Sequence, residues 1–195
     1  MFSKKGGRKT LGRRLFSLQT LLIFAFIAIS LGTLYFIANV PANYTQIKLL
    51  SKQDMLARNE VYSAISMLDA LNNKVKTGEM SLASAKKLGA DLLRNMRYGA
   101  TKDLYFFVDT TEGVNVVMLG DKTIEGKNRL SEMANGVYYI KELIKTSQQA
   151  DGGYVNYMYP KPGETKAKEK RSYALEFKPF GWVVGSGYYI EDVAK

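Results

Sequence analysis

The apolar residues of this chain change their period within one short stretch, Met96 to Asp109. Before it they recur about every 3.6 positions, as in an amphipathic helix, and after it they alternate, as in a strand. Gly99 stands where a helix commonly ends, and the β-rich run from Leu104 to Val108 follows at once. The sequence therefore predicts helices first and strands afterwards, which is an α+β fold.

The composition excludes several classes of site. The 195 residues include no cysteine and no histidine, which removes disulfides, zinc–thiolate sites, histidine-ligated haem and the Ser-His-Asp triad. A phospho-accepting histidine is missing as well. Gly185-Ser186-Gly187 lies in a predicted strand with no helix after it, whereas a dinucleotide site needs a third glycine and a helix. We therefore expect no enzyme activity and no cofactor.

The net charge of +10 is concentrated at the N-terminus. Six bases lie within residues 1–14, and no acid precedes Asp54. The rest of the chain carries 22 bases and 18 acids. A nucleic-acid surface normally gathers its bases on one face, so we expect no nucleic-acid partner.

Residues 15–40 are predicted to cross a membrane. No charged residue lies between Leu15 and Ile47, and Phe16 to Ala38 would span roughly 34 Å as a helix, enough for a hydrocarbon core of ~30 Å. A cleaved signal peptide is the alternative, because Val40-Pro41-Ala42 offers small residues, but its apolar region is normally only about 7–15 residues long. The basic arm then lies in the cytoplasm, and everything after residue 40 lies outside.

Three helices and five strands are predicted. The long first helix carries one apolar stripe, and we expect it to pack on its own domain and to pair with the same helix of a second copy as a homodimer. Ser81 is a plausible N-cap for the second helix, and Arg94 and Arg97 suit its last turn. The predicted helices span residues 43–76, 82–98 and 131–149, and the strands span residues 104–109, 114–119, 154–159, 170–177 and 182–190.

The predicted strands are rich in aromatic residues. Alternation places Tyr105 and Phe107 on one face of their strand and Phe106 and Val108 on the other. A buried tyrosine hydroxyl needs a partner, so several tyrosines on one sheet face suit a small polar ligand better than an oily core. Lys170 opens a strand, where a lysine is usually exposed; turned inward, it would pair with a carboxylate.

The C-terminal half resembles the single Cache domain, a family of extracytoplasmic sensor domains of bacterial chemoreceptors and related kinases. The resemblance covers roughly residues 43–193 and depends on the order and spacing of short blocks, of which the last is the most specific. The blocks are Arg94-x-x-Arg97-Tyr98-Gly99, Leu104–Val108, Glu125–Asn128, Asn135-Gly136, Gly153–Lys161, Lys170-x-Ser172-Tyr173 and Pro179–Asp192.

The resemblance implies a long N-terminal helix on a PAS-like antiparallel sheet of about five strands, with a pocket between sheet and loops. Similar members bind short organic acids, urea or other small polar compounds. The positions that match the family's pocket are Tyr105, Phe107, Met118, Tyr157 and Lys170. Many members carry a His-Pro pair near the end of the second strand, and this chain has Met118-Leu119 there, which removes a polar ligand contact.

The leading hypothesis is a transmembrane chemoreceptor whose sensor domain, residues 41–193, binds a short organic acid without catalysis. Lys170 pairs with the anionic end of the ligand, Tyr157 hydrogen-bonds to it, and Tyr105 and Phe107 line the apolar part. Loop closure then moves the last strand relative to the first helix. Similar receptors continue into a second membrane helix and a cytoplasmic region, so we expect this chain to be a fragment ending before that helix.

The alternatives to this function are an input domain of another receptor, a structural subunit and an enzyme. The input domain of a histidine kinase or a cyclase differs only in the cytoplasmic part. A pilin-like subunit also begins with an apolar helix, but it has a glutamate early in that helix, and here no acid precedes Asp54. A membrane-anchored enzyme is disfavoured by the absence of histidine and cysteine.

Overall fold

The computed structural model describes residues 7–119 and 122–193, with side chains for residues 16–37, 44–119 and 122–193. Two compact units divide the chain, Met1–Ile47 and Lys48–Lys195. Helix α1, Gly7–Lys76, contributes to both units. The side chains of the predicted basic arm lie outside the described residues, so its placement in the cytoplasm stays a prediction.

In the first unit, Phe16–Ile37 is long and apolar enough to cross a membrane, with a mean hydropathy of 2.3. Its large apolar side chains are exposed, unlike those of a helix in a soluble core. Two of its hydroxyls bond back to helix carbonyls, Thr20 to the oxygen of Phe16 and Thr33 to that of Ser30. These bonds satisfy polar groups that hydrocarbon could not.

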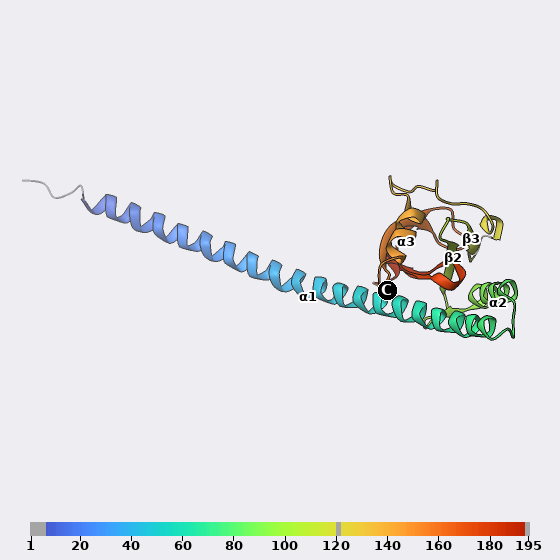
Figure 1. The fold of residues 1–195 in the computed structure, drawn as a ribbon. Coiled ribbons are helices and arrows are strands. Elements are labelled where there is room, and N and C mark those ends of the chain that lie inside the picture. The colour runs from blue at the N-terminus through green and yellow to red at the C-terminus, as the bar shows by residue number, and fades with distance from the viewer. Residues whose placement is uncertain (1–6, 120–121, 194–195) are drawn as a thin grey trace, which may run out of the picture. The chain divides into compact units, whose positions relative to one another are not determined.

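Among the described residues, the second unit combines the end of α1, two more α-helices, three short 3₁₀ helices and a six-stranded antiparallel sheet (Figure 1). The other α-helices are α2, Leu82–Asn95, and α3, Tyr139–Ser147. The 3₁₀ helices are η1, Lys122–Ile124; η2, Lys178–Phe180; and η3, Ile190–Asp192. The strands are β1, Arg97–Tyr98; β2, Leu104–Thr110; β3, Asn115–Val117; β4, Gly153–Pro160; β5, Ala167–Phe177; and β6, Trp182–Tyr189. They run across the sheet in the order β1-β2-β6-β5-β4, and β3 pairs with β2 beside this path.

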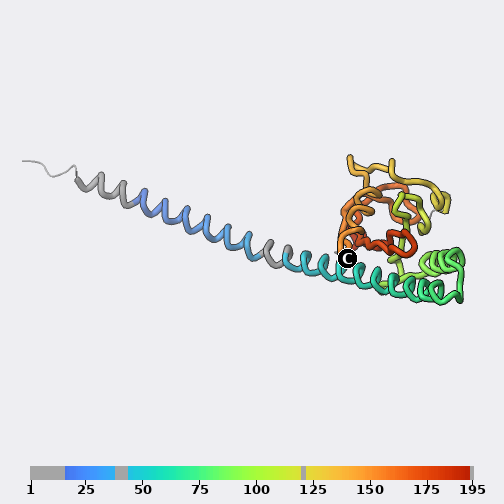
Figure 2. The backbone as a smooth tube through the Cα atoms, in the orientation of Figure 1, coloured from blue at the N-terminus to red at the C-terminus, as the bar shows by residue number. Residues whose placement is uncertain are grey.

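Local signals set the turn between α1 and α2. Gly78 follows the end of α1 with a φ of 79°, a conformation that glycine adopts without strain. The hydroxyl of Ser81 accepts from the N–H of Ser84 at 3.1 Å, so the predicted N-cap is confirmed. The chain reverses here, and α2 runs back beside the end of α1 (Figure 2).

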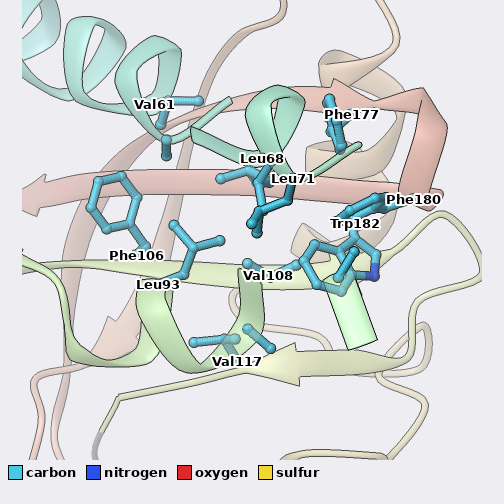
Figure 3. Close-up of a cluster of buried hydrophobic side chains, with 14 of the residues drawn as sticks. Val61, Leu68, Leu71, Leu93, Phe106, Val108, Val117, Phe177, Phe180 and Trp182 are labelled. Carbon is cyan, nitrogen blue, oxygen red and sulfur yellow. The ribbon is translucent and has the colours of Figure 1, made fainter. Parts of the chain in front are cut away.

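The sheet separates two clusters of buried side chains. On one face, α1 and α2 pack against Phe106, Val108 and Trp182 (Figure 3). On the other face, α3 packs over Tyr105 and Phe107. Successive side chains of a strand point to opposite faces, and the predicted division of β2 into two faces is confirmed.

Hydrogen bonds tie α1 to three strands on the first of these faces. The carboxylate of Asp54 accepts from Arg171 Nε at 2.8 Å and Nη2 at 3.0 Å, and from the hydroxyl of Tyr188 at 2.8 Å. The hydroxyl of Tyr154 donates to the backbone oxygen of Asp54 at 2.7 Å. One turn of α1 is thereby attached to β4, β5 and β6 together.

The predicted end of the second helix is wrong. The helix stops at Asn95, because Arg97 and Tyr98 pair with β2 as strand β1. The Arg97 side chain still binds carbonyl groups at the end of the helix, as the sequence predicted. Its Nη1 donates to the carbonyl oxygens of Arg94 at 2.8 Å and Met96 at 2.6 Å. Pairing with the sheet outweighs the local helical preference here.

Three other predicted elements differ by two residues or more at one end or both, and β2, β4 and β6 differ by no more than one residue at either end. The helix expected over residues 131–149 begins only at Tyr139, because Asn135 and Gly136, with φ values of 47° and 77°, form a turn before it. The strand expected over residues 114–119 is confined to Asn115–Val117. Strand β5 begins at Ala167, three residues before its expected start.

Gly185 makes room for the ring of Phe107. The two residues are direct partners across β2 and β6, and a Cβ on Gly185 would lie 2.2 Å from Cζ of that ring. A real Cβ cannot approach a ring carbon so closely. The glycine at the start of the Gly-Ser-Gly sequence therefore has a packing role.

We predict that Gly185→Ala destabilises the chain by about 1–3 kcal/mol, the usual cost of overpacking a core. Trp182 is the single tryptophan and is buried in the core, so its fluorescence reports urea unfolding of the 195-residue chain in detergent micelles. Phe107→Leu removes the clashing ring atoms and should rescue part of the loss. Additive losses in the double variant, or a fully stable Gly185→Ala, would contradict this account.

Candidate functional site

Lys170 lies in the middle of the sheet with its side chain buried. It belongs to β5, between β4 and β6, and its direct partners on these strands are Tyr157 and Tyr189. Only 1% of the residue is exposed. Its Nζ donates to the hydroxyl of Tyr105 at 2.8 Å. The expectation that a lysine at a strand opening is usually exposed does not hold for Lys170.

Four aromatic rings surround the Lys170 ammonium. Its Nζ lies 4.3 Å from the ring centre of Tyr105, 5.3 Å from that of Tyr189, and 5.5 Å from those of Phe107 and Tyr159. Ring faces attract cations, but burial still lowers the pKa of Lys170 because it disfavours the charged form. Among the described side chains, no acidic group forms an ion pair with Lys170.

Arg129 is a second buried cation at the same place. It lies between β3 and α3, with 1% of the residue exposed. Its Nε and Nη2 each donate to the carboxylate of Glu132 at 2.9 Å, and Nη2 also donates to the hydroxyl of Tyr139 at 3.2 Å. Its Nη1 lies 3.6 Å from Asp109 Oδ1 and has no hydrogen-bond partner among the described residues.

Asp109, near the end of β2, is the deeper of the two carboxylates beside Arg129. It is 2% exposed and accepts a hydrogen bond from Nδ2 of Asn115 at 2.9 Å. Burial raises the pKa of Asp109 to about 6, although Arg129 and Asn115 both act in the opposite direction. The ionised form of Asp109 is thus poorly stabilised at its position.

A cavity of about 10 Å³ lies among these groups, large enough for no more than one water molecule. Tyr157 forms part of its wall: the ring stacks on Tyr139 with centres 5.0 Å apart, and the hydroxyl lies 3.0 Å from Ser172 Oγ. The residues that line the cavity are Phe107, Met118, Arg129, Tyr139, Ile140, Leu143, Tyr157, Tyr159 and Lys170.

Four of the five residues predicted from the sequence line this cavity: Phe107, Met118, Tyr157 and Lys170. Tyr105, the fifth, contacts the site through its hydrogen bond to Lys170. Sequence reasoning missed Arg129 and Tyr139. The one signal available for Arg129 was a glutamate three residues later, a spacing that is common in exposed loops and says nothing of burial.

A larger cavity, of about 360 Å³, lies near the end of β6 and is lined in part by Gln53, Tyr105, Lys161 and Tyr188. Its lysine is already neutralised, because Lys161 Nζ lies 2.9 Å from a Glu191 oxygen and 2.8 Å from an Asp192 oxygen. The small cavity, by contrast, has a buried ammonium that is hydrogen-bonded only to a hydroxyl. The small cavity is therefore the better place for an anion.

The chemistry that this site offers is the binding of a small anion. Two buried cations reach one cavity, and only Arg129 is paired with carboxylates. Aromatic and aliphatic side chains supply the rest of the wall. Among the described residues, no cluster of His, Cys, Asp or Glu could hold a metal ion.

Comparison with known proteins identifies a matching family. The model of Single Cache domain 2 matches residues 49–195. The solved periplasmic sensor domain of a chemotaxis protein is 30% identical, with a TM-score of 0.67 over 72% of this chain and 96% of that one.

Two curated proteins match as well. The methyl-accepting chemotaxis protein McpP of Pseudomonas putida is 30% identical over 138 residues, which cover 70% of this chain and 25% of McpP. The sensor histidine kinase MctS of Rhizobium johnstonii is 30% identical over 177 residues, which cover 88% of this chain and 37% of MctS. The chain thus spans well under half the length of either relative.

We predict that Asp109 makes stability depend on pH. Its folded-state pKa of about 6 lies above the ordinary value of 3.8, so its ionisation costs stability as pH rises through this window. The difference in unfolding free energy, wild type minus Asp109→Asn, should fall by up to about 1.4 kcal/mol per pH unit between pH 4 and 6. Urea unfolding across this range measures it, and a flat or rising difference would contradict the raised pKa.

Proposed function

This chain belongs to the Single Cache domain 2 family, and from that premise we propose that it is the extracytoplasmic sensor of a membrane chemoreceptor for a short organic acid. Residues 15–40 would anchor the chain, residues 1–14 would lie in the cytoplasm, and residues 41–193 would form the sensor. The chain would bind and signal without catalysis.

The observation that carries this proposal is the buried ammonium of Lys170. It lies beside a second buried cation, and its hydrogen-bond partner is a hydroxyl rather than a carboxylate. An unpaired buried charge is costly, and an incoming anion would relieve that cost. A ligand carboxylate is the simplest anion that could pair with this ammonium.

Each predicted site residue has a role in this proposal. Lys170 would donate to the ligand carboxylate, and Tyr157 would hydrogen-bond to it in place of Ser172. Phe107 and Met118 would contact the short apolar part of the acid. Tyr105 would keep the ammonium in place through its hydroxyl and ring.

Strand β5 offers a route from the ligand to helix α1. Lys170 faces the cavity, and the next residue, Arg171, faces the other way and pairs with Asp54 of α1. A shift of β5 on ligand binding would therefore reach α1 through that ion pair. The ligand can bias this shift only by binding one of the two arrangements more tightly.

Three parts of the proposal concern the longer protein. Pairing of α1 with a second copy would form a homodimer, and the chain would continue into a second membrane helix. Chemotaxis is the proposed output. Input to a histidine kinase is the second candidate, because the match to MctS covers 88% of this chain.

We predict that Lys170→Met weakens the binding of acetate or propionate by roughly 10- to 150-fold, which corresponds to a charged hydrogen bond of about 1.5–3 kcal/mol. The variant should also melt at no lower a temperature than the wild type without ligand, because an unpaired buried charge is removed. Isothermal titration calorimetry of the 195-residue chain in detergent micelles measures the affinity, and thermal unfolding measures the stability.

Lys168→Met is the matched control. Lys168 lies two residues earlier on the same strand, and it pairs with Glu191 outside the cavity at 2.8 Å. Acetate should bind this variant as it binds the wild type. Equal affinity of Lys170→Met and wild type for both acids would refute the role of Lys170, and no binding of any short acid by the wild type would refute the proposed function.

A further inference from the structure

The arginine of the site is already paired with a carboxylate of the protein itself. The carboxylate of Glu132 accepts hydrogen bonds from Arg129 Nε and Nη2 at 2.9 Å each. This is the bidentate geometry in which an arginine binds a carboxylate ligand. The hydroxyl of Tyr139 donates to Oε2 of the same carboxylate. Glu132 thus makes the contacts that a bound organic acid would make with Arg129 and Tyr139.

The cavity beside Arg129 is too small for any organic acid. Its volume is about 10 Å³, room for at most one water molecule, so something must move before an acid can enter. Asp109 is a poor candidate, because it is 2% exposed and held by Asn115 on strand β3. The walls on β4 and β5 belong to the sheet, where β5 is paired on both sides and β4 is paired along its length with β5.

Glu132 is the group that can leave. It lies in the segment between Arg129 and α3, where residues 130–138 belong to no helix or strand. Its side chain is 36% exposed, whereas that of Arg129 is 2% exposed. Moving this carboxylate outward returns it to water, which costs little compared with moving a fully buried charge.

The charges of the site lead to the same conclusion. Arg129 and Lys170 carry two positive charges, and Asp109 and Glu132 supply two carboxylates. With Asp109 and Glu132 both in place, a ligand carboxylate would be the third carboxylate around one guanidinium and would be repelled by the other two. Exchange of Glu132 for the ligand keeps their number at two, which is the less costly event.

We propose that Glu132 is an internal competitor for the acid site: its carboxylate occupies Arg129 in the absence of ligand, and the ligand carboxylate displaces it. This inference builds on the proposed function and adds a residue that sets the affinity. Residues 130–138, the segment that carries Glu132, then move whenever an acid binds. The position of this segment therefore depends on whether the site is occupied.

Glu132→Gln tests the idea, because the amide keeps the size of the side chain and removes its charge. Acetate should bind this variant about tenfold more tightly than the wild type, since the apparent affinity rises with the fraction of protein whose site is free. The variant without ligand should nevertheless melt at a lower temperature, because Arg129 loses its charged partner. Calorimetry and thermal unfolding of the 195-residue chain in detergent micelles give the two numbers.

The opposite results have clear meanings. If Glu132 instead holds Arg129 in the correct orientation for the ligand, Glu132→Gln will bind acetate more weakly, and the competitor model is wrong. Unchanged affinity would also overturn it. Tighter binding together with lower stability is the combination that a purely structural ion pair cannot produce.

Glu125→Gln is the matched control. Glu125 accepts from Arg94 Nε and Nη2 at 3.0 Å each, the same kind of pair, and it does not line the cavity. Its bond from the N–H of Met118, at 3.2 Å, can be kept by the amide oxygen of glutamine. This variant should lose stability and keep the acetate affinity of the wild type.

Failure of this inference can be told apart from failure of the proposed function. Acetate binding by the wild type, with no binding of the uncharged acetamide, supports the acid site whatever Glu132 does. In that case an unchanged or weakened Glu132→Gln overturns only the competitor. If the wild type binds neither acetate nor propionate and Glu132→Gln binds neither as well, both proposals are wrong.

Discussion

The burial of one ammonium governs the pocket side of this sheet. Lys170 is 1% exposed, and its direct partners on both neighbouring strands, Tyr157 and Tyr189, are tyrosines. A charge there requires compensation, and the structure supplies it with a hydroxyl at 2.8 Å and four ring faces rather than with an acid. Tyr105, Phe107, Tyr159 and Tyr189 are the aromatic residues of these strands that meet this requirement. Aromatic side chains are large enough to fill the layer under α3, and they also attract the cation.

The alternation of side chains along β2 keeps the side chains around Lys170 apart from the hydrophobic core under α1 and α2. Phe106 and Val108 pack under α1 and α2, while Tyr105 and Phe107 face α3, although all four are consecutive in β2. The close fit of Phe107 over Gly185 lets β2 and β6 pair without a gap. Because one strand serves both faces, a shift of that strand would move the side chains of both faces together. In β5, Lys170 lines the cavity, and the next residue, Arg171, contacts α1.

Sequence reasoning succeeded where structure is set locally and failed where distant residues decide. Alternation along β2 predicted correctly which side chains share a face, because the period of a strand is a local property. The end of α2 was predicted wrongly, since Arg97 and Tyr98 are drawn into the sheet by β2. Arg129 was missed because its burial depends on β2 and α3 closing over a loop, and nothing in the residues around it shows that closure. Lys170 was singled out from its place in a predicted strand and again from the family resemblance, while its aromatic surroundings required the sheet register.

The choice of a tyrosine rather than an acid as the partner of Lys170 has a functional consequence. A carboxylate at hydrogen-bond distance would neutralise the ammonium permanently, and a ligand would have to break that pair before it could bind. The Tyr105 hydroxyl holds the ammonium in position and leaves its charge available. A site with an unneutralised ammonium is less stable than a neutralised one, and under the proposed function a ligand that supplied the missing charge would stabilise the fold by mass action. Arg129 shows the contrasting arrangement, since its charge is already matched by Glu132, so the two cations of one cavity would contribute to binding in different ways: Lys170 by attraction, and Arg129 by exchange of one carboxylate for another.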